Sequence, residues 1–249
     1  MSGVVVAVGD IHGRFDLYQQ LRAKILNDLK SYRKKKIIFL GDFIDRGPSS
    51  KEVVDSFLNN PLPGFEHIFL TGNHEQWLTD VLNNNFTFDE FLAWLLYGGI
   101  ETMQSYGINV LDFVNRRTMI AHHNGVYGVD VKEILLPKIN DIMSFIPDDH
   151  RKFYKNLKVH YRFKKYFFVH AGIDPYKPIE KQDLYDFLMI RETFLNSNKN
   201  YGFKVVHGHS PSENVDFYCS RIGVDTGAFY SNKLSAVVLT DKEEYVLNT

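Results

Sequence analysis

The sequence predicts an α/β fold, because one structural unit repeats three times in its first third. In each unit a short apolar run rich in β-branched residues ends in a polar turn that contains glycine, and a helical pattern follows. Strands that alternate with helices at intervals of about 30 residues are typical of βαβ units around a parallel sheet. Apolar residues make up 44% of the 249 residues, which argues against a disordered chain.

The first three units define six elements. Their strands are predicted over residues 4–8, 37–40 and 66–70. Their helices are predicted over residues 16–29, 49–58 and 76–82. Ligands bind beyond the carboxyl ends of the strands in such sheets, and all three polar turns fall there.

The rest of the chain carries weaker signals. Helical patterns cover residues 86–97 and 147–157, whereas residues 118–129 show no pattern that predicts an element. Short strands are predicted over residues 166–169, 203–206, 221–224, 234–239 and 244–247. The last two strands are close enough to form a hairpin. No linker or low-complexity tract interrupts the chain, so we expect one domain over residues 1–249.

Charge and cysteine content exclude several classes of protein. There are 29 Lys and Arg against 30 Asp and Glu, a net charge of −1, which argues against a nonspecific nucleic-acid binder. A single cysteine, Cys219, rules out an internal disulfide framework and a Cys-cluster metal site. No apolar run approaches the ~18 residues of a membrane span, and no signal peptide is evident. We expect a soluble, cytoplasmic protein that binds neither nucleic acid nor membrane.

Potential metal ligands follow the first three predicted strands. Asp10 and His12 are two residues apart, a spacing that directs both side chains to one face of an extended chain. Asp42 and Asn73 each come directly after a glycine at the next two strand ends. Taken alone, Asp10 and His12 could equally well belong to an ordinary turn that binds no metal. Together the three turns gather carboxylates into one crevice, where divalent cations would relieve their repulsion.

Histidines follow two strands of the last third. His170 ends one strand, and His207 and His209 follow another; the spacing does not choose between these last two. A lone histidine at a strand end more often has a structural role than a metal-binding one. Two strands that both end in a histidine and a glycine turn favour the metal-binding role. Six candidate ligands exceed the needs of one zinc ion and fit two metals ~3.5–4 Å apart, with Asp42 as a possible bridge.

The same turns offer an acid and an anion-binding group. His74 follows Asn73 and is the natural acid for a leaving oxygen, and Asp45 could orient it. Arg46 could bind phosphate through both arms of its guanidinium. In isolation, Asp45 and Arg46 would be read as a surface ion pair. The chain has no G-x-S-x-G, Walker A or G-x-G-x-x-G motif that would indicate another chemistry.

These motifs resemble the signature blocks of the phosphoprotein phosphatases, Ser/Thr phosphatases among the calcineurin-like metallophosphoesterases. The three early blocks are residues 9–13, 41–47 and 72–75. Residues 169–172 resemble a later histidine block of the family, and residues 208–210 and 223–227 resemble two blocks of its bacterial and phage branch. The resemblance covers residues 4–239 and is weakest over residues 83–140.

The resemblance implies a fold and a set of roles. The fold is a β-sandwich flanked by helices, in four layers α/β/β/α. One metal would be held by Asp10, His12 and Asp42, and the second by Asp42, Asn73, His170 and His209. His209 is preferred to His207 because it occupies the Gly-His position. His74 with Asp45 would form the acid pair, and Arg46 and Arg191 would bind phosphate. Mn²⁺ is the expected metal, with Fe or Zn as alternatives.

The implied activity is that of a metal-dependent serine/threonine protein phosphatase. A hydroxide bridging two metals would attack a phosphomonoester of a phosphoprotein or phosphopeptide. Bacterial hydrolases of dinucleoside polyphosphates, such as diadenosine tetraphosphate, share these blocks and are the alternative; a noncatalytic binding module is a more distant one. Thr71 stands where the family usually has arginine, so substrate preference is expected to differ. His122 and His123 match no block and are interpreted as structural or surface residues.

Overall fold

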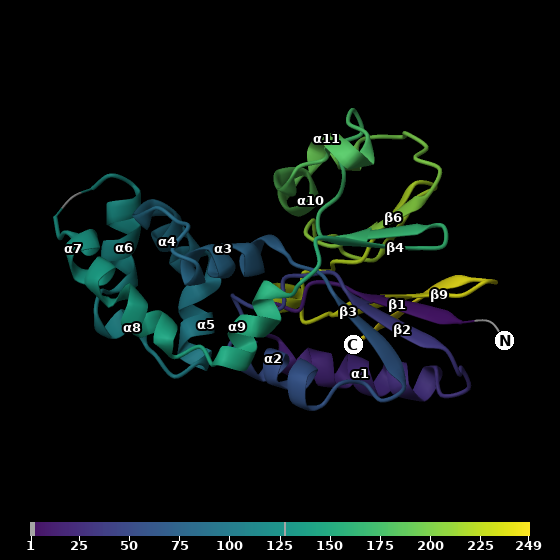
Figure 1. The fold of residues 1–249 in the computed structure, drawn as a ribbon, viewed down its shortest axis with the longest axis horizontal. Helices are drawn as coiled ribbons and strands as arrows, with labels where there is room; N and C mark the ends of the chain where they lie inside the picture. The colour runs from purple at the N-terminus through teal and green to yellow at the C-terminus, as the bar shows by residue number, and fades with distance from the viewer. Residues whose placement is uncertain (1–2, 127) are drawn as a thin grey trace.

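Two five-stranded sheets form the centre of the molecule in a computed structural model that describes residues 3–126 and 128–249 (Figure 1). The first sheet has the order β10-β9-β1-β2-β3 and the second β4-β5-β6-β8-β7. The first comprises β1 (Val4–Val8), β2 (Lys35–Phe39), β3 (Phe65–Phe69), β9 (Ser235–Leu239) and β10 (Glu244–Asn248). The second comprises β4 (His160–Phe163), β5 (Tyr166–Val169), β6 (Lys204–His207), β7 (Asp216–Phe217) and β8 (Arg221–Gly223).

The predicted strands of the first sheet are confirmed. β1, β2 and β3 are parallel neighbours, as the βαβ pattern predicts. The predicted C-terminal hairpin is β9 and β10, and β9 pairs antiparallel with β1. The carboxyl ends of the three parallel strands therefore meet at one edge, next to a strand from the far end of the chain.

The second sheet contains two strands that the sequence does not predict. β5, β6 and β8 are parallel to one another, and the additional strands β4 and β7 pair antiparallel at the two edges. β4 alternates between exposed and partly buried residues and has no fully buried one, so its apolar pattern is weak. β7 has only two residues, too few to show a period-2 pattern.

Alternation along the strands produces the layers. On β1, Val4, Val6 and Val8 belong to the core on the helical side of the first sheet. Val5 and Ala7 face the opposite way, into the core between the sheets, where they join Phe168 of β5. The far face of the second sheet packs against further helices through a third core (Figure 1). The four-layer sandwich implied by the resemblance is thereby confirmed.

Twelve α-helices accompany the sheets within the described residues. They are α1 (Phe15–Asp28), α2 (Ser50–Asn59), α3 (Asn73–Leu82), α4 (Phe88–Trp94), α5 (Ile100–Ser105), α6 (Arg116–His123), α7 (Val131–Leu135), α8 (Ile139–Ser144), α9 (Asp148–Lys155), α10 (Leu184–Met189), α11 (Glu192–Leu195) and α12 (Ala228–Ser231). The predicted helices over residues 16–29, 49–58, 76–82 and 147–157 correspond to α1, α2, α3 and α9. α1 and α2 cover the first sheet, and α10 and α11 the second (Figure 1).

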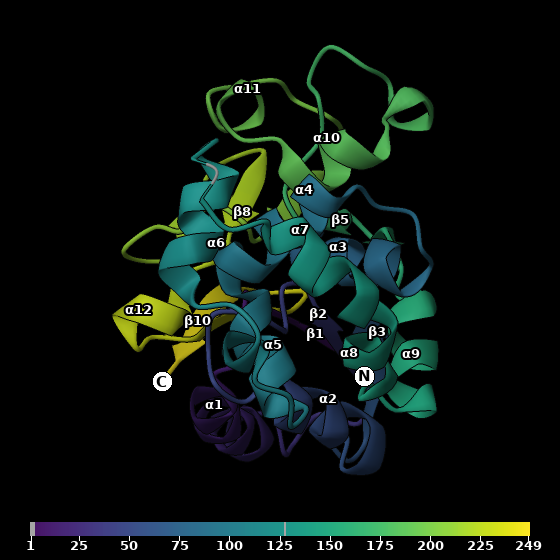
Figure 2. The same cartoon turned by 90° about the vertical axis from the view of Figure 1, so that its left-hand side faces the viewer.

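The helices of the middle of the chain, from α4 to α8, form a helical extension at one end of the sandwich (Figures 1 and 2). The helix predicted over residues 86–97 corresponds to α4, after which the chain kinks at Gly98, where φ is 128°, before α5 begins. The unassigned residues 118–129 begin inside α6, whose only buried side chain is Met119, so little amphipathic signal is available there. The extension shares a hydrophobic core with α1 and the first sheet. That the chain is one domain stays a prediction.

None of the helices in the described part of the chain is both long and apolar enough to cross a lipid bilayer. The cytoplasmic location stays a prediction.

Candidate active site

The polar turns of both sheets meet at one place. Loops that follow β1, β2 and β3 contribute from the first sheet, and loops that follow β5 and β6 contribute from the second. All six predicted metal ligands are buried there: Asp10, His12, Asp42, Asn73, His170 and His209. Each sheet therefore supplies part of the candidate ligand set.

The backbone of these loops is unusual. Eight described residues other than glycine have a left-handed φ, and five of them lie in this site: His12, Asp42, Asp45, Arg46 and His209. Such conformations cost about 1–3 kcal/mol each and cluster at functional sites. The expectation that Asp10 and His12 share a face of an extended chain is wrong, because His12 has φ 46° and lies in a turn beyond β1.

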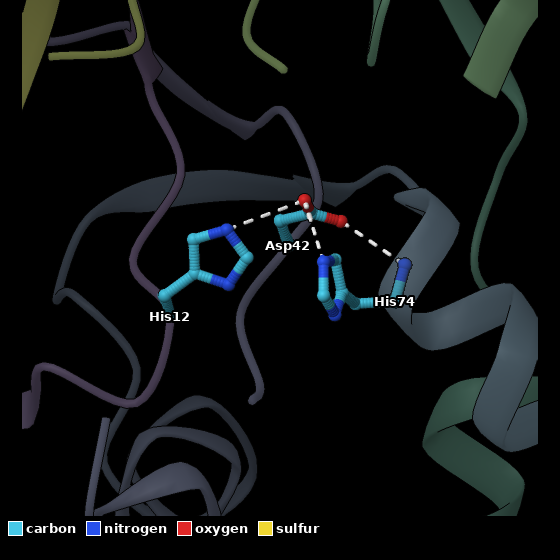
Figure 3. A group of neighbouring side chains, drawn as sticks. All are labelled: His12, Asp42 and His74. Carbon is cyan, nitrogen blue, oxygen red and sulfur yellow. Dashed lines mark hydrogen bonds and ion pairs between the residues drawn. The ribbon is translucent and has the colours of Figure 1, made fainter. Parts of the chain in front are cut away.

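One group of potential ligands comprises His12, Asp42 and His74 (Figure 3). Their ligand atoms lie within 4.8 Å of one another, and Asp42 Oδ2 is 3.4 Å from His12 Nε2 and 3.9 Å from His74 Nε2. The Nδ1 atom of His12 donates to the carbonyl of Ile44 at 2.9 Å. Since that hydrogen bond holds the proton on Nδ1, the lone pair of Nε2 faces the site.

A second group comprises Asp42, His170 and His209. Here Nδ1 of His170 donates to the carbonyl of Leu40 at 2.9 Å, which leaves Nε2 to face the other ligand atoms. That Nε2 atom is 3.0 Å from Asn73 Oδ1, 3.2 Å from His209 Nδ1 and 3.4 Å from Asp42 Oδ1. Asp42 thus belongs to both groups, and His207 to neither.

Asp10 contacts the second group through the backbone of His209 rather than through a side-chain ligand atom. Its carboxylate accepts the backbone N–H of His209 at 3.0 and 3.2 Å, and it is in neither of the two groups. Burial, Asp225 and Asp42 raise the pKa of Asp10 well above its usual value. Burial likewise raises the pKa of Asp225 to about 6. Sequence reasoning missed Asp225, although it lies in the resembling block at residues 223–227.

These residues fit a pair of divalent cations. Buried carboxylates repel one another here, and each of the two groups brings three buried ligand atoms within 4.8 Å of one another. Oxygen and imidazole nitrogen donors that converge in this way suit divalent metals. Cations would relieve the repulsion that raises the pKa of Asp10.

The predicted acid pair is in contact. His74 Nδ1 donates to Asp45 Oδ2 at 2.6 Å, with both side chains buried. Burial lowers the pKa of His74, but Asp42 and Asp45 outweigh it, and the pKa lies above its usual value. The imidazole is thereby favoured in its protonated form.

Two residues of the helical extension hold Asp45, and sequence reasoning missed both. Trp94 Nε1 donates to Asp45 Oδ2 at 2.9 Å, and Thr102 Oγ1 donates to Oδ1 at 2.5 Å. Thr102 Oγ1 also accepts the backbone N–H of Asp45 at 2.8 Å. Trp94 and Thr102 are fully buried. No motif marks them, because they lie where the resemblance is weakest.

The extension also holds the backbone of Arg46. The carbonyl of Gly98 accepts the Arg46 N–H at 3.3 Å, and a Cβ on Gly98 would lie 2.5 Å from that nitrogen. The guanidinium lies between two imidazoles, with Nη1 3.0 Å from His12 Nε2 and Nη2 3.1 Å from His74 Nε2. It also lies 4.7 Å from the centre of the Phe229 ring. Arg46 is therefore fixed beside both the first ligand group and the acid.

Glu75 connects the loops that carry these residues. One carboxylate oxygen accepts the N–H groups of Asp42 (2.8 Å) and Gly72 (2.9 Å), and the other accepts those of Phe43 (2.7 Å) and Ile44 (3.2 Å). Burial and Asp42 raise its pKa to about 7. Sequence reasoning assigned Glu75 no role. Its place three residues after the helix N-cap Gly72 is the available signal, because glutamate there commonly bonds back to the N-cap backbone.

Two further residues lie at the edge of the site. Arg191 is exposed, and its Nη1 is 3.4 Å from the hydroxyl of Ser210, next to His209. Thr71, in place of the usual arginine, is buried, and its backbone N–H donates to the carbonyl of Lys158 at 2.8 Å. Arg191 is therefore placed at the rim, whereas Thr71 brings no charge to the site.

Comparison with known proteins agrees with this geometry. The calcineurin-like phosphoesterase family matches residues 3–240. The chain is 23% identical to the asymmetrical bis(5'-nucleosyl)-tetraphosphatase PrpE of Bacillus mycoides (strain KBAB4), over 92% of this chain and 88% of that protein. It is 22% identical to the protein of the same name from Bacillus cereus (strain B4264), over 95% of this chain and 90% of that protein.

Solved structures share the fold. One provisionally named as a diadenosine tetraphosphatase has a TM-score of 0.62 at 19% identity, covering 99% of this chain and 93% of that one. A cold-active protein tyrosine phosphatase has a TM-score of 0.55 at 16% identity, covering 98% and 78%. The family match spans nearly the whole chain and both groups of potential metal ligands. The chain is a member of the calcineurin-like phosphoesterase family, and thus a metallophosphoesterase.

Proposed function

We propose that this protein is a metal-dependent hydrolase of dinucleoside tetraphosphates, the substrate class for which its sequence relatives are named. The observation that carries the proposal is that one carboxylate, Asp42, belongs to two groups of buried ligands beside the contact between His74 and Asp45. Together they provide two cation sites and an acid at one point, which hydrolysis of a phosphoanhydride or phosphoester can use.

We assign the ligands as the resemblance implies. One cation takes Asp10, His12 and Asp42, and the other takes Asp42, Asn73, His170 and His209. Mn²⁺ is the proposed metal, with Fe or Zn as alternatives, because these ligand types discriminate weakly among such ions. When bound, the cations supply Lewis acidity, which activates water and neutralises phosphate charge.

The remaining residues bind phosphate and handle the proton. The two guanidinium nitrogens of Arg46 that now contact His12 and His74 match the spacing of two phosphate oxygens. A bound phosphate competes for them and frees His74 Nε2. Asp45 accepts the Nδ1–H of His74, and Asp42 and Asp45 together raise the pKa of His74. In the imidazolium form that they favour, Nε2 carries the proton that passes to the leaving oxygen. Arg191, at the rim, adds a second cationic side chain for the phosphate chain.

A serine/threonine protein phosphatase is the second candidate. It is supported by the early blocks at residues 9–13, 41–47 and 72–75, which resemble those of the phosphoprotein phosphatases. The site residues proposed above serve either substrate, since in both reactions water attacks a phosphorus atom and displaces an oxygen leaving group. The two candidates differ in the leaving group, and therefore in what surrounds His74 rather than in the ligand set.

The test is steady-state hydrolysis after chelation and reloading with Mn²⁺. Diadenosine tetraphosphate is compared with phosphoserine, phosphothreonine and phosphotyrosine peptides, and nucleotide products are separated by chromatography. We expect preference for the dinucleotide, with products that distinguish asymmetrical cleavage to ATP and AMP from symmetrical cleavage to ADP. Preference for phosphopeptides would establish the second candidate. Full activity of Asp42→Asn or His74→Asn would overturn the site assignment.

A further inference from the structure

A cavity of about 240 Å³ opens beside the proposed ligand Asn73. Its walls are α3, the segment that leads into α4, and α10, which lies above α3 (Figure 1). Pockets that enclose a whole small-molecule ligand measure roughly 300–1,000 Å³. The cavity is therefore sized for a single ring system rather than for an entire nucleotide.

Aromatic side chains form two of its walls. The ring of Trp77 lies edge-on to His74, 5.3 Å between centres, and 6.0 Å from the ring of Tyr97. Tyr185 of α10 also lines the cavity and is 66% exposed. The buried side chain of Leu188 adds an apolar surface. A flat ring that enters between Trp77 and Tyr185 would meet aromatic and apolar surfaces.

The charged groups of the cavity exclude phosphate from it. Asp80 and Glu90 line it, and no lysine or arginine does among the residues described. The Oδ1 atom of Asp80 accepts the side-chain amides of Gln76 (3.1 Å) and Asn85 (3.3 Å). An anionic phosphate would be repelled by two carboxylates, whereas a neutral ring with N–H donors would be attracted.

The cavity adjoins His74, the residue proposed to protonate the leaving group. His74 Nε2 carries the proton for the leaving oxygen in the proposed reaction, and the His74 ring contacts Trp77 directly. Asn73, next in sequence, lines the cavity. A leaving nucleotide protonated by His74 would therefore have its base within reach of Trp77.

We propose that this cavity is the subsite for a nucleobase of the leaving nucleotide, with the ring between Trp77 and Tyr185 and an exocyclic amine directed to Asp80 or Glu90. The inference rests on the proposed function and extends it from the phosphate chain to the base. A purine such as adenine carries the required amine, and the Gln76 and Asn85 amides match the hydrogen-bonding edge of adenine.

A phosphate-free probe tests the subsite apart from catalysis. The chain has two tryptophans, and Trp94 is fully buried, so adenosine bound in the cavity would quench Trp77. We expect saturable quenching by adenosine, with affinity reduced roughly 5- to 100-fold in Tyr185→Ala. Tyr176, 86% exposed and outside the cavity, provides the matched control Tyr176→Ala, which should quench like the unmodified protein. Absence of quenching, or quenching by argininamide in its place, would overturn the proposal.

Kinetics provide the second measurement. The ratio of kcat/KM for diadenosine tetraphosphate over that for inorganic tripolyphosphate, which has no base, should fall about tenfold in Tyr185→Ala and stay unchanged in Tyr176→Ala. An unchanged ratio in Tyr185→Ala would refute the subsite even if the dinucleotide is hydrolysed. Adenosine quenching that depends on Tyr185, without turnover of the dinucleotide, would support the subsite and refute the proposed function.

Discussion

Substituting Glu75 by glutamine should destabilise the protein far more than so small a change suggests. The carboxylate accepts four backbone N–H groups, two on each oxygen, from Asp42, Phe43, Ile44 and Gly72. A glutamine has one acceptor oxygen, and its NH₂ group would face the other two N–H donors. Each buried donor left unsatisfied costs about 1–3 kcal/mol, so we expect a loss of about 2–6 kcal/mol.

The assay is thermal and denaturant unfolding of Glu75→Gln after chelation. For a domain of this size about 1 kcal/mol corresponds to roughly 2–4 °C, so the Tm should fall by at least about 4 °C. Glu90→Gln is the matched control, because Glu90 occupies the same position of the next helix and bonds back to Thr87, but is exposed. It should cost less than about 1 kcal/mol. Equal, small effects of both substitutions would refute the assignment of Glu75 as the residue that fixes these loops.

Three other perturbations test neighbouring parts of the site. Thr102→Val removes a hydroxyl that donates to Asp45 and should lower kcat about 10- to 100-fold with little change in KM; a change in KM alone would contradict a positioning role. Arg46→Lys loses the two-armed contact with His12 and His74. It should raise the KM for phosphate substrates and weaken inhibition by inorganic phosphate. Unchanged inhibition would argue against phosphate binding at Arg46. Chelation should lower the Tm of the metal-loaded protein, and Asp42→Asn should abolish that difference, since Asp42 belongs to both ligand groups; a chelator-sensitive Tm in the variant would contradict the shared role.

Much of the first sheet and of the proposed ligand set can be predicted from the sequence. Three strand–turn–helix units place Asp10, Asp42 and Asn73 at neighbouring strand ends, and the structure brings these ends together. The prediction succeeds there because each of these strands ends in apolar residues followed by a turn that contains glycine, although β2 begins with two lysines and β3 contains Glu66 and His67. The roles assigned to these residues stay predictions that the variants above test.

The sequence does not reveal the hydrogen bonds by which residues far away in the chain hold the site residues in place. Trp94 and Thr102 lie 49 and 57 residues from Asp45 in the chain. Trp94 falls in the helix predicted over residues 86–97 with nothing to mark a polar role, and Thr102 lies where no element is predicted. The left-handed backbone at His12 is also invisible to periodicity, since a turn rather than a strand positions its side chain. Side-chain hydrogen bonds between distant segments leave no local pattern from which they could be inferred.

The strand order of the first sheet has a consequence for biosynthesis. β1 is the first strand to be made, yet one of its two neighbours, β9, lies more than two hundred residues later, where Leu239 pairs with Val5. At a synthesis rate of about 5–20 residues per second, the edge of β1 that pairs with β9 stays unpaired for roughly 10–50 s during translation. The hydrogen bond between Asp10 and the backbone of His209 forms almost as late, because His209 is made 199 residues after Asp10. An emerging chain thus exposes a hydrophobic edge and has only four of the six proposed ligands until His170 and His209 are made. Chaperone protection and late metal loading are therefore expected to precede activity.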